Sequence, residues 1–134
     1  MLATRRVLLI DDDEINNFIC IKNIKNSGFA EYATSCLNGQ DGLDELTEAL
    51  QERPEDLPDV IFLDINMPGM KAWQFLESYE KLTNRFTKEV KLFILTSSVY
   101  RKDMEKSTTF PFVSDYLIKP LNEQILSELK EKYF

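Results

Sequence analysis

The sequence predicts an α/β domain in which a parallel sheet is covered by helices on both faces. Short apolar runs alternate five times with segments whose spacing is helical, and this alternation is typical of parallel sheets. Four of the runs end in an aspartate, a hydroxyl or a lysine. The 134 residues fit one domain of ordinary size, so we expect a single domain over residues 1–134.

The first half of the chain holds three predicted strands and two predicted helices. Gly28 is expected to stop the first helix, and the prolines of RPEDLP (53–58) to end the second. The second helix carries Leu43, Leu46 and Leu50, which form one apolar stripe. The first helix rests on apolar residues at positions 15, 18, 19, 20, 21 and 24. In order, the elements are strand 5–10, helix 14–27, strand 30–36, helix 38–51 and strand 59–63.

The second half continues the alternation. A helix is expected where apolar residues recur from Ala72 to Leu82, and Asn122 is expected to cap the last helix. We assign Trp73, Phe75 and Phe93 to packing. The remaining predicted elements are strand 90–95, a short polar helix within 100–109, and strand 113–118.

Composition excludes several classes of function. The formal net charge of −7 argues against a nucleic-acid interface, which needs a basic face. The chain has no histidine, so histidine-based acid–base catalysis, histidine metal ligation and a phosphohistidine carrier are excluded. Cys20 and Cys36 lack metal-ligand spacing and are expected to be buried free thiols. Since no apolar stretch reaches the roughly 18 residues of a membrane span, we expect a cytoplasmic protein.

Polar residues gather where the predicted strands end. The first strand runs into Asp11, Asp12 and Asp13, the third into Asp64, the fourth into Thr96 and Ser97, and the fifth into Lys119. Ligands of parallel open sheets bind at this edge. Clustered carboxylates repel one another unless a hard cation lies among them, and Mg²⁺ prefers a few carboxylate oxygens plus water. A lysine and a hydroxyl opposite such a metal suit a phosphoryl group.

Four motifs at these strand ends resemble the receiver domains of two-component response regulators. They are LLIDDD at 8–13, FLDINMPGM at 62–70, ILTSS at 94–98 and YLIKPL at 116–121. Each motif alone is weak, but all four in order over nearly the whole chain are specific. The resemblance implies a flavodoxin-like fold with strand order 2-1-3-4-5, five helices on both faces, and no output domain.

The resemblance also implies a role for each polar residue. Asp64 accepts a phosphoryl group from a phosphohistidine of a sensor histidine kinase or a histidine phosphotransfer protein. Asp12 and Asp64 bind Mg²⁺ directly, Asp11 does so through water, and the carbonyl of Asn66 completes the protein ligands. The phosphoryl oxygens are held by Thr96 and Lys119. An aspartate is already ionised at neutral pH, so such a nucleophile needs charge neutralisation rather than a general base.

Further implications concern signalling. Phosphorylation is expected to draw Thr96 inward and Tyr116 after it, which changes the surface of residues 100–109, the last strand and the last helix for a downstream partner that the sequence does not name. Asn66 and Ser98 flank the approach of water and are expected to tune the lifetime of the phosphoryl group.

Two positions next to the motifs stand apart. Asp13 is expected to cap the first helix rather than bind metal. Where many receivers carry an Asp-Gly pair, this chain has Lys71-Ala72. A lysine near a helix start opposes the helix dipole, and the loss of glycine restricts the loop backbone.

Two other functions are compatible with parts of the pattern. One is a Mg²⁺-dependent phosphatase of the haloacid dehalogenase type, with Asp11 as nucleophile and Asp13 as its second acid; the late acidic pair of that family is missing, since only Asp115 stands there. The other is a receiver-shaped interaction module that is never phosphorylated. The complete set of Asp12, Asp64, Thr96 and Lys119 argues against it.

Overall fold

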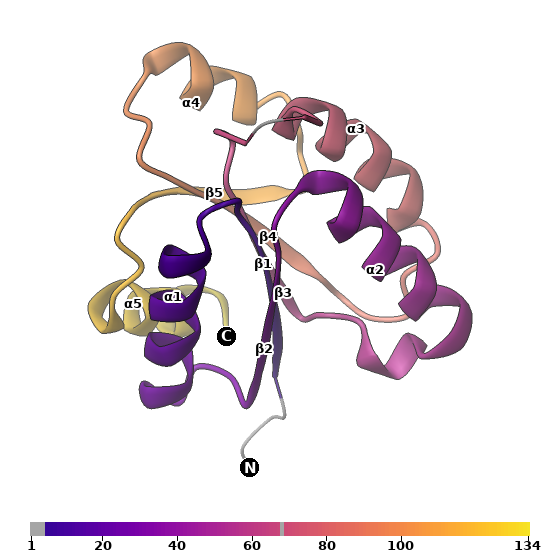
Figure 1. The fold of residues 1–134 in the computed structure, drawn as a ribbon, viewed down its shortest axis with the longest axis horizontal. Helices are drawn as coiled ribbons and strands as arrows, with labels where there is room; N and C mark the ends of the chain where they lie inside the picture. The colour runs from indigo at the N-terminus through magenta and orange to yellow at the C-terminus, as the bar shows by residue number, and fades with distance from the viewer. Residues whose placement is uncertain (1–4, 68) are drawn as a thin grey trace.

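A computed structural model describes residues 5–67 and 69–134 and shows a five-stranded parallel sheet between two layers of helices (Figure 1). The strands lie in the order β2-β1-β3-β4-β5, which confirms the predicted flavodoxin-like topology. Because the order reverses between β1 and β3, the crossover helices fall on opposite faces of the sheet. The strands are β1 (Arg6–Ile10), β2 (Tyr32–Cys36), β3 (Val60–Leu63), β4 (Lys91–Thr96) and β5 (Val113–Ile118).

Helices follow the strands, and they cover both faces as predicted. Helices α1 and α5 lie on one side of the sheet, and α2 and α3 lie on the other (Figure 1). A short 3₁₀ turn, Pro54–Asp56, follows α2 at the predicted break. The helices are α1 (Glu14–Asn26), α2 (Gly39–Glu52), α3 (Ala72–Thr83), α4 (Arg101–Ser107) and α5 (Glu123–Tyr133).

The strand register aligns the polar strand ends. Ile10 pairs with Leu63, and Asp64 N–H donates to the carbonyl of Ile10 over 2.9 Å. At the other side of the sheet, Lys119 N–H donates to the carbonyl of Thr96 over 2.8 Å. The residues that follow β1, β3, β4 and β5 are therefore brought to one edge by backbone hydrogen bonds alone.

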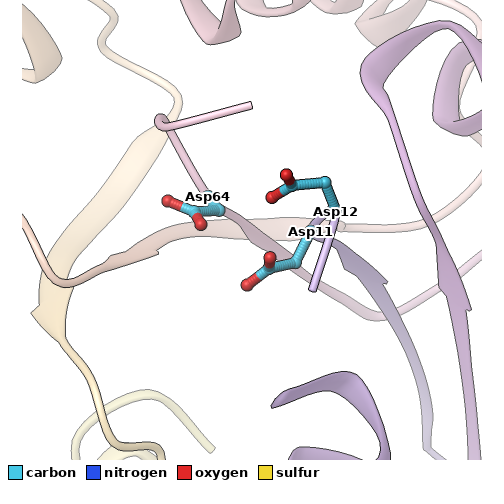
Figure 2. A group of neighbouring side chains, drawn as sticks. All are labelled: Asp11, Asp12 and Asp64. Atoms are coloured by element: carbon cyan, nitrogen blue, oxygen red, sulfur yellow. The ribbon is translucent and has the colours of Figure 1, made fainter. Parts of the chain in front are cut away.

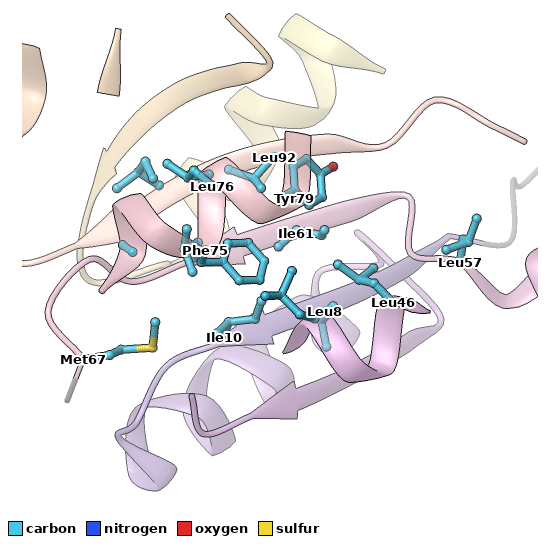
Figure 3. Close-up of a cluster of buried hydrophobic side chains, with 14 of the residues drawn as sticks. Leu8, Ile10, Leu46, Leu57, Ile61, Met67, Phe75, Leu76, Tyr79 and Leu92 are labelled. Atoms are coloured by element: carbon cyan, nitrogen blue, oxygen red, sulfur yellow. The ribbon is translucent and has the colours of Figure 1, made fainter. Parts of the chain in front are cut away.

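The larger hydrophobic core lies between the sheet and helices α2 and α3 (Figure 3). Side chains of the central strands, such as Leu8, Ile10 and Ile61, meet Leu46 and Phe75 from these helices. Gly42 allows the close contact between α2 and β1, because a Cβ there would lie 2.6 Å from Ile10 Cδ1. The leucine stripe predicted for α2 is thus a buried face.

A second core lies under α1 and α5. The rings of Phe62 and Phe93 stack at 5.6 Å between centroids, and Cys20, Ile24 and Leu126 cover them from the helices. Phe75 on the other face is also fully buried. Trp73 is only partly buried and lies parallel to Phe110, at 6.1 Å between centroids. All three aromatic residues assigned to packing therefore pack.

Several expectations need correction in detail. Strand β2 begins at Tyr32 rather than at residue 30, because Phe29 and Ala30 belong to the buried turn that leads into it. Cys20 is buried as expected, but Cys36 is only partly buried. The last helix was expected to form part of an output surface, but Leu129 within it and Leu121 before it are buried core residues. The motif at 62–70 includes residue 68, which lies outside the described residues.

Helix α1 differs most from the expectation of an ordinary packed helix. Cys20 and Ile24 are buried, but Ile15, Phe18 and Ile19 are 73%, 70% and 50% exposed. The apolar residues are spread around this helix, so that only part of them can face the sheet.

Candidate functional site

Three carboxylates meet at the carboxyl edge of the sheet (Figure 2). Asp11 and Asp12 follow β1, and Asp64 follows β3. Each can offer an oxygen such that the three oxygens lie within 4.8 Å of one another. Asp11 and Asp64 are buried, whereas Asp12 is exposed. Three oxygens at this separation can share one divalent cation, and the set suits the hard-cation chemistry of Mg²⁺.

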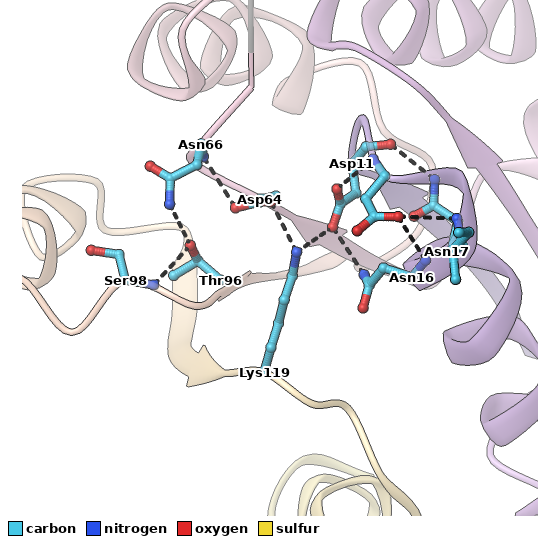
Figure 4. Close-up of polar contacts among 10 residues, drawn as sticks. Asp11, Asn16, Asn17, Asp64, Asn66, Thr96, Ser98 and Lys119 are labelled. Carbon is cyan, nitrogen blue, oxygen red and sulfur yellow. Dashed lines mark hydrogen bonds and ion pairs between the residues drawn. The ribbon is translucent and has the colours of Figure 1, made fainter.

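Lys119 reaches across the edge from the end of β5 and lies between two of these acids (Figure 4). Its Nζ is 2.6 Å from Asp11 Oδ2 and 3.0 Å from Asp64 Oδ2. The ammonium group therefore already contacts the carboxylate that was expected to accept a phosphoryl group.

Burial decides the electrostatics of the site. Burial raises the pKa of Asp11, and hydrogen bonds from Lys119 and from the Asp13 backbone offset this only in part. Burial alone would lower the pKa of Lys119, but hydrogen bonds to Asp11 and Asp64 outweigh it, so that this pKa is raised. Lys119 therefore holds its proton more tightly than a free lysine. Ionisation of Asp11 is unfavourable unless further positive charge lies beside it.

The hydroxyl of Thr96 lies on the far side of Asp64 from Asp11, within a small network (Figure 4). Asn66 Nδ2 donates to Thr96 Oγ1 over 3.3 Å, and the backbone N–H of Ser98 donates to the same oxygen over 3.3 Å. Asn66 N–H also donates to Asp64 Oδ1 over 3.1 Å. The two residues flanking the expected water path, Asn66 and Ser98, are therefore linked through the threonine hydroxyl.

Tyr116 joins this network from β5. Its hydroxyl donates to the carbonyl of Ser98 over 2.9 Å, and its ring packs against the α2/α3 core. Ser98 Oγ in turn donates to Asp103 Oδ2 over 2.7 Å at the start of α4. Hydrogen bonds thus connect Asp64 to α4 and β5 through Asn66, Thr96 and Ser98.

Asp13 points away from the carboxylate cluster, as predicted. Its Oδ1 accepts hydrogen bonds from the backbone N–H groups of Ile15 and Asn16, each over 3.0 Å. It is therefore the N-cap of α1. Asn122 caps α5 in the same way, through Ile125 N–H.

Sequence reasoning missed two asparagines that hold Asp11. Asn16 Nδ2 donates to Asp11 Oδ2 over 3.0 Å, and Asn17 Nδ2 donates to the Asp11 backbone carbonyl over 2.9 Å. The one signal in the sequence is a pair of adjacent amides in the first turns of the helix, where asparagine has a poor helix propensity.

Lys71 stands at the start of α3, where its charge opposes the helix dipole. Its backbone N–H donates to Gln74 Oε1 over 2.9 Å, which pairs the one backbone N–H group of this residue. Helix α3 thus begins at Ala72 with a lysine before it. Among the described helices, none has both the length and the apolar character to cross a bilayer.

Comparison with known proteins identifies the family of this chain. A family profile described as "Response regulator receiver domain" matches residues 7–130. The hybrid signal transduction histidine kinase F of Dictyostelium discoideum is 28% identical over 131 residues, which are 96% of this chain and 11% of that protein. The chain spans between 7% and 14% of the first four curated relatives that it matches.

Solved structures agree with this result. A two-component response regulator from Cytophaga hutchinsonii superposes with a TM-score of 0.85 at 29% identity, covering 96% of both chains. The receiver domain of the histidine kinase CKI1 from Arabidopsis thaliana, complexed with Mg²⁺ and BeF₃⁻, superposes with a TM-score of 0.79 at 22% identity. The match covers 98% of this chain and 93% of that one. The family profile spans nearly the whole length, and this chain therefore belongs to the response regulator receiver domains of two-component signalling.

Proposed function

We propose that Asp64 accepts a phosphoryl group from a phosphohistidine, with Mg²⁺ bound in the Asp11–Asp12–Asp64 cluster. The observation that carries this proposal is the Lys119 ammonium group, which lies 3.0 Å from Asp64 at the edge of three clustered carboxylates. A nucleophilic carboxylate with a fixed cation beside it is the arrangement that phosphoryl transfer requires.

In this reaction the P–N bond of the phosphohistidine breaks as a P–O bond to Asp64 forms, and the imidazole leaves with the electron pair. Mg²⁺ would be held by Asp12 and Asp64, by Asp11 through water, and by the Asn66 carbonyl, and would neutralise charge on the phosphoryl oxygens. Lys119 holds one of these oxygens and Thr96 donates to another. The donor in this proposal is a sensor histidine kinase or a histidine phosphotransfer protein.

The geometry does not favour a phosphatase with Asp11 as nucleophile. Asp11 Oδ1 accepts the N–H of Asp13, and Oδ2 accepts both Lys119 and Asn16. The acid that such a mechanism needs, Asp13, caps α1 instead. A carboxylate that accepts more hydrogen bonds is a weaker nucleophile, and among the described residues Asp64 accepts only two, from Asn66 N–H and from Lys119.

The acceptor is tested by labelling with acetyl phosphate and Mg²⁺ and by intact mass. The wild type is expected to gain one phosphoryl group, and Asp64→Asn to gain none while its circular dichroism is unchanged. Asp11→Asn is the matched comparison, because it keeps the acceptor and removes one pocket charge. Labelling of Asp64→Asn at the wild-type level would reject Asp64 as the acceptor and favour the phosphatase.

We further propose that the network from Thr96 to Tyr116 carries the signal to α4 and β5. A phosphoryl oxygen on Asp64 accepts the Thr96 O–H and draws this hydroxyl inward, away from the Asn66 and Ser98 N–H groups that donate to its oxygen. The loop at Ser98 that holds Tyr116 then moves with it. Thr96→Ala is expected to be labelled at Asp64 but to lose the phosphorylation-dependent change of the Tyr116 ring signals in NMR spectra. If those signals change as in the wild type, this coupling is wrong.

A further inference from the structure

The first turn of α1 surrounds Asp11 with hydrogen-bond donors (Figure 4). The backbone N–H of Asp13 donates to Oδ1 over 2.9 Å, and Asn16 Nδ2 donates to Oδ2 over 3.0 Å. The adjacent side chain, Asn17, donates to the backbone carbonyl of the same residue over 2.9 Å. Three residues of one short segment therefore hold three different atoms of one acid.

Asn17 occupies a position that packing alone would give to an apolar residue. It is only 2% exposed, and within the described part of the chain its Oδ1 finds no hydrogen-bond donor. A buried amide with an unsatisfied oxygen costs stability. The Nδ2 group of the same amide donates to the Asp11 carbonyl, and this hydrogen bond fixes the position of the Asp11 main chain. Asn16 then controls only the rotation of the Asp11 side chain.

Asp11 Oδ2 is shared between two donors of different kinds. Lys119 Nζ lies 2.6 Å from it, and Asn16 Nδ2 lies 3.0 Å from it. The proposed phosphoryl transfer turns the ammonium group of Lys119 toward the phosphoryl oxygens, which weakens its contact with this carboxylate. The amide of Asn16 is uncharged and stays on α1, so that its bond is unaffected by the transfer.

We propose that Asn16 is a positioning residue, which holds the Asp11 carboxylate toward the metal site together with Lys119 and without depending on the state of that lysine. This inference rests on the proposed function and assigns a further residue to that site. The side chain of Asn16 acts through Asp11 and has no contact with the reacting atoms. Partners of this kind fix the orientation of a metal-binding carboxylate, and their loss weakens metal binding.

The test is calorimetric titration of Mg²⁺ into unphosphorylated protein, so that it requires no phosphoryl transfer. Asn16→Leu keeps the approximate shape of the side chain and removes the donor. We expect this variant to bind Mg²⁺ about tenfold more weakly, at the lower end of the effects of such partners because Asn16 is partly exposed. Its midpoint of thermal unfolding without metal is expected to match the wild type.

Asn23→Leu is the matched control. Asn23 lies on the same helix, is also partly buried, and donates to the neutral carbonyl of Leu121 over 3.1 Å. Its loss should lower the unfolding midpoint and leave Mg²⁺ affinity unchanged. Asn16→Gln retains the amide donor and should bind Mg²⁺ more tightly than Asn16→Leu.

Three results would overturn the inference: wild-type affinity in Asn16→Leu, an equal loss of affinity in Asn23→Leu, or equal affinities of the Leu and Gln variants at position 16. The proposed function fails differently, because then the wild type itself binds no Mg²⁺ or takes no phosphoryl group at Asp64.

Discussion

Helices α1 and α2 follow neighbouring strands, yet they use their apolar residues in opposite ways. Leu46 of α2 is fully buried, and Leu43 and Ala49 lie on the same buried face. In α1, Phe18 is 70% exposed while the polar Asn17 is buried. The helix that begins at the acidic pocket thus directs an amide inward and apolar side chains outward.

The difference shows that stability alone accounts for α2 but not for α1. A helix packed for stability would bury its large apolar side chains, each of which stabilises the fold by about 1.5–3 kcal/mol. Helix α1 loses part of this stabilisation, and its inward amide holds Asp11 instead. We infer that the sequence of α1 serves both the pocket and a small part of the core, through Cys20 and Ile24, whereas the sequence of α2 is set by the core.

The largest expected effect is on stability when matched apolar side chains of the two helices are truncated. Leu46→Ala removes a fully buried side chain and should lower the free energy of unfolding by about 3 kcal/mol. Ile19→Ala, on the exposed part of α1, should change it by less than about 0.5 kcal/mol. Urea denaturation measures both. Equal losses would mean that the exposed face of α1 is packed in solution and that the comparison is wrong.

A smaller effect on stability is expected from Cys20, which lies on the part of α1 that packs against the sheet. Burial raises the pKa of the Cys20 thiol from 9.0 to about 11. On raising the pH the unfolded chain loses this proton first, so that the contribution of the thiol is complete below pH 9 and is lost by about pH 11. Over this window the wild type should lose about 2 kcal/mol more unfolding free energy than Cys20→Ala.

The comparison with Cys20→Ala isolates this thiol, because lysines, tyrosines and Cys36 titrate in both proteins. The measurement is denaturant unfolding at a series of pH values. Parallel curves for the two proteins would show that the thiol of Cys20 is solvated in the folded state, and with it this side of α1.

The smallest effects distinguish two adjacent acids at the start of α1. Asp13→Ala removes the helix cap and should cost about 1 kcal/mol of stability while leaving Mg²⁺ affinity nearly unchanged. Asp12→Ala removes a charge from the cluster, so that metal-free protein should gain about 0.5 kcal/mol while its Mg²⁺ affinity falls sharply.

Calorimetry with Mg²⁺ and urea denaturation without metal check this pair. The same loss of affinity in both variants would mean that the acids of the pocket are assigned one position out of register. A loss of stability in Asp12→Ala would contradict repulsion within the cluster.

The sequence by itself determined the fold and the position of the pocket. Strands end where apolar runs meet Asp11, Asp64, Thr96 and Lys119, and parallel pairing must bring such ends to one edge. The caps at Asp13 and Asn122 were also predictable, since a helix start needs an acceptor within three residues. The alternation of strands and helices and the caps are visible in the local pattern, whereas the strand order 2-1-3-4-5 was implied by the resemblance of the four motifs to receiver domains.

Only the tertiary structure decided which side chains meet. The bond of Asn66 to Thr96 joins residues 30 positions apart, and the link of Tyr116 to Ser98 depends on the register of β4 and β5. The inward turn of Asn17 and the exposure of Phe18 depend on the rotation of α1 about its axis. Apolar residues are spread around that helix, so periodicity cannot fix its rotation, whereas the hydrogen bonds to Asp11 can.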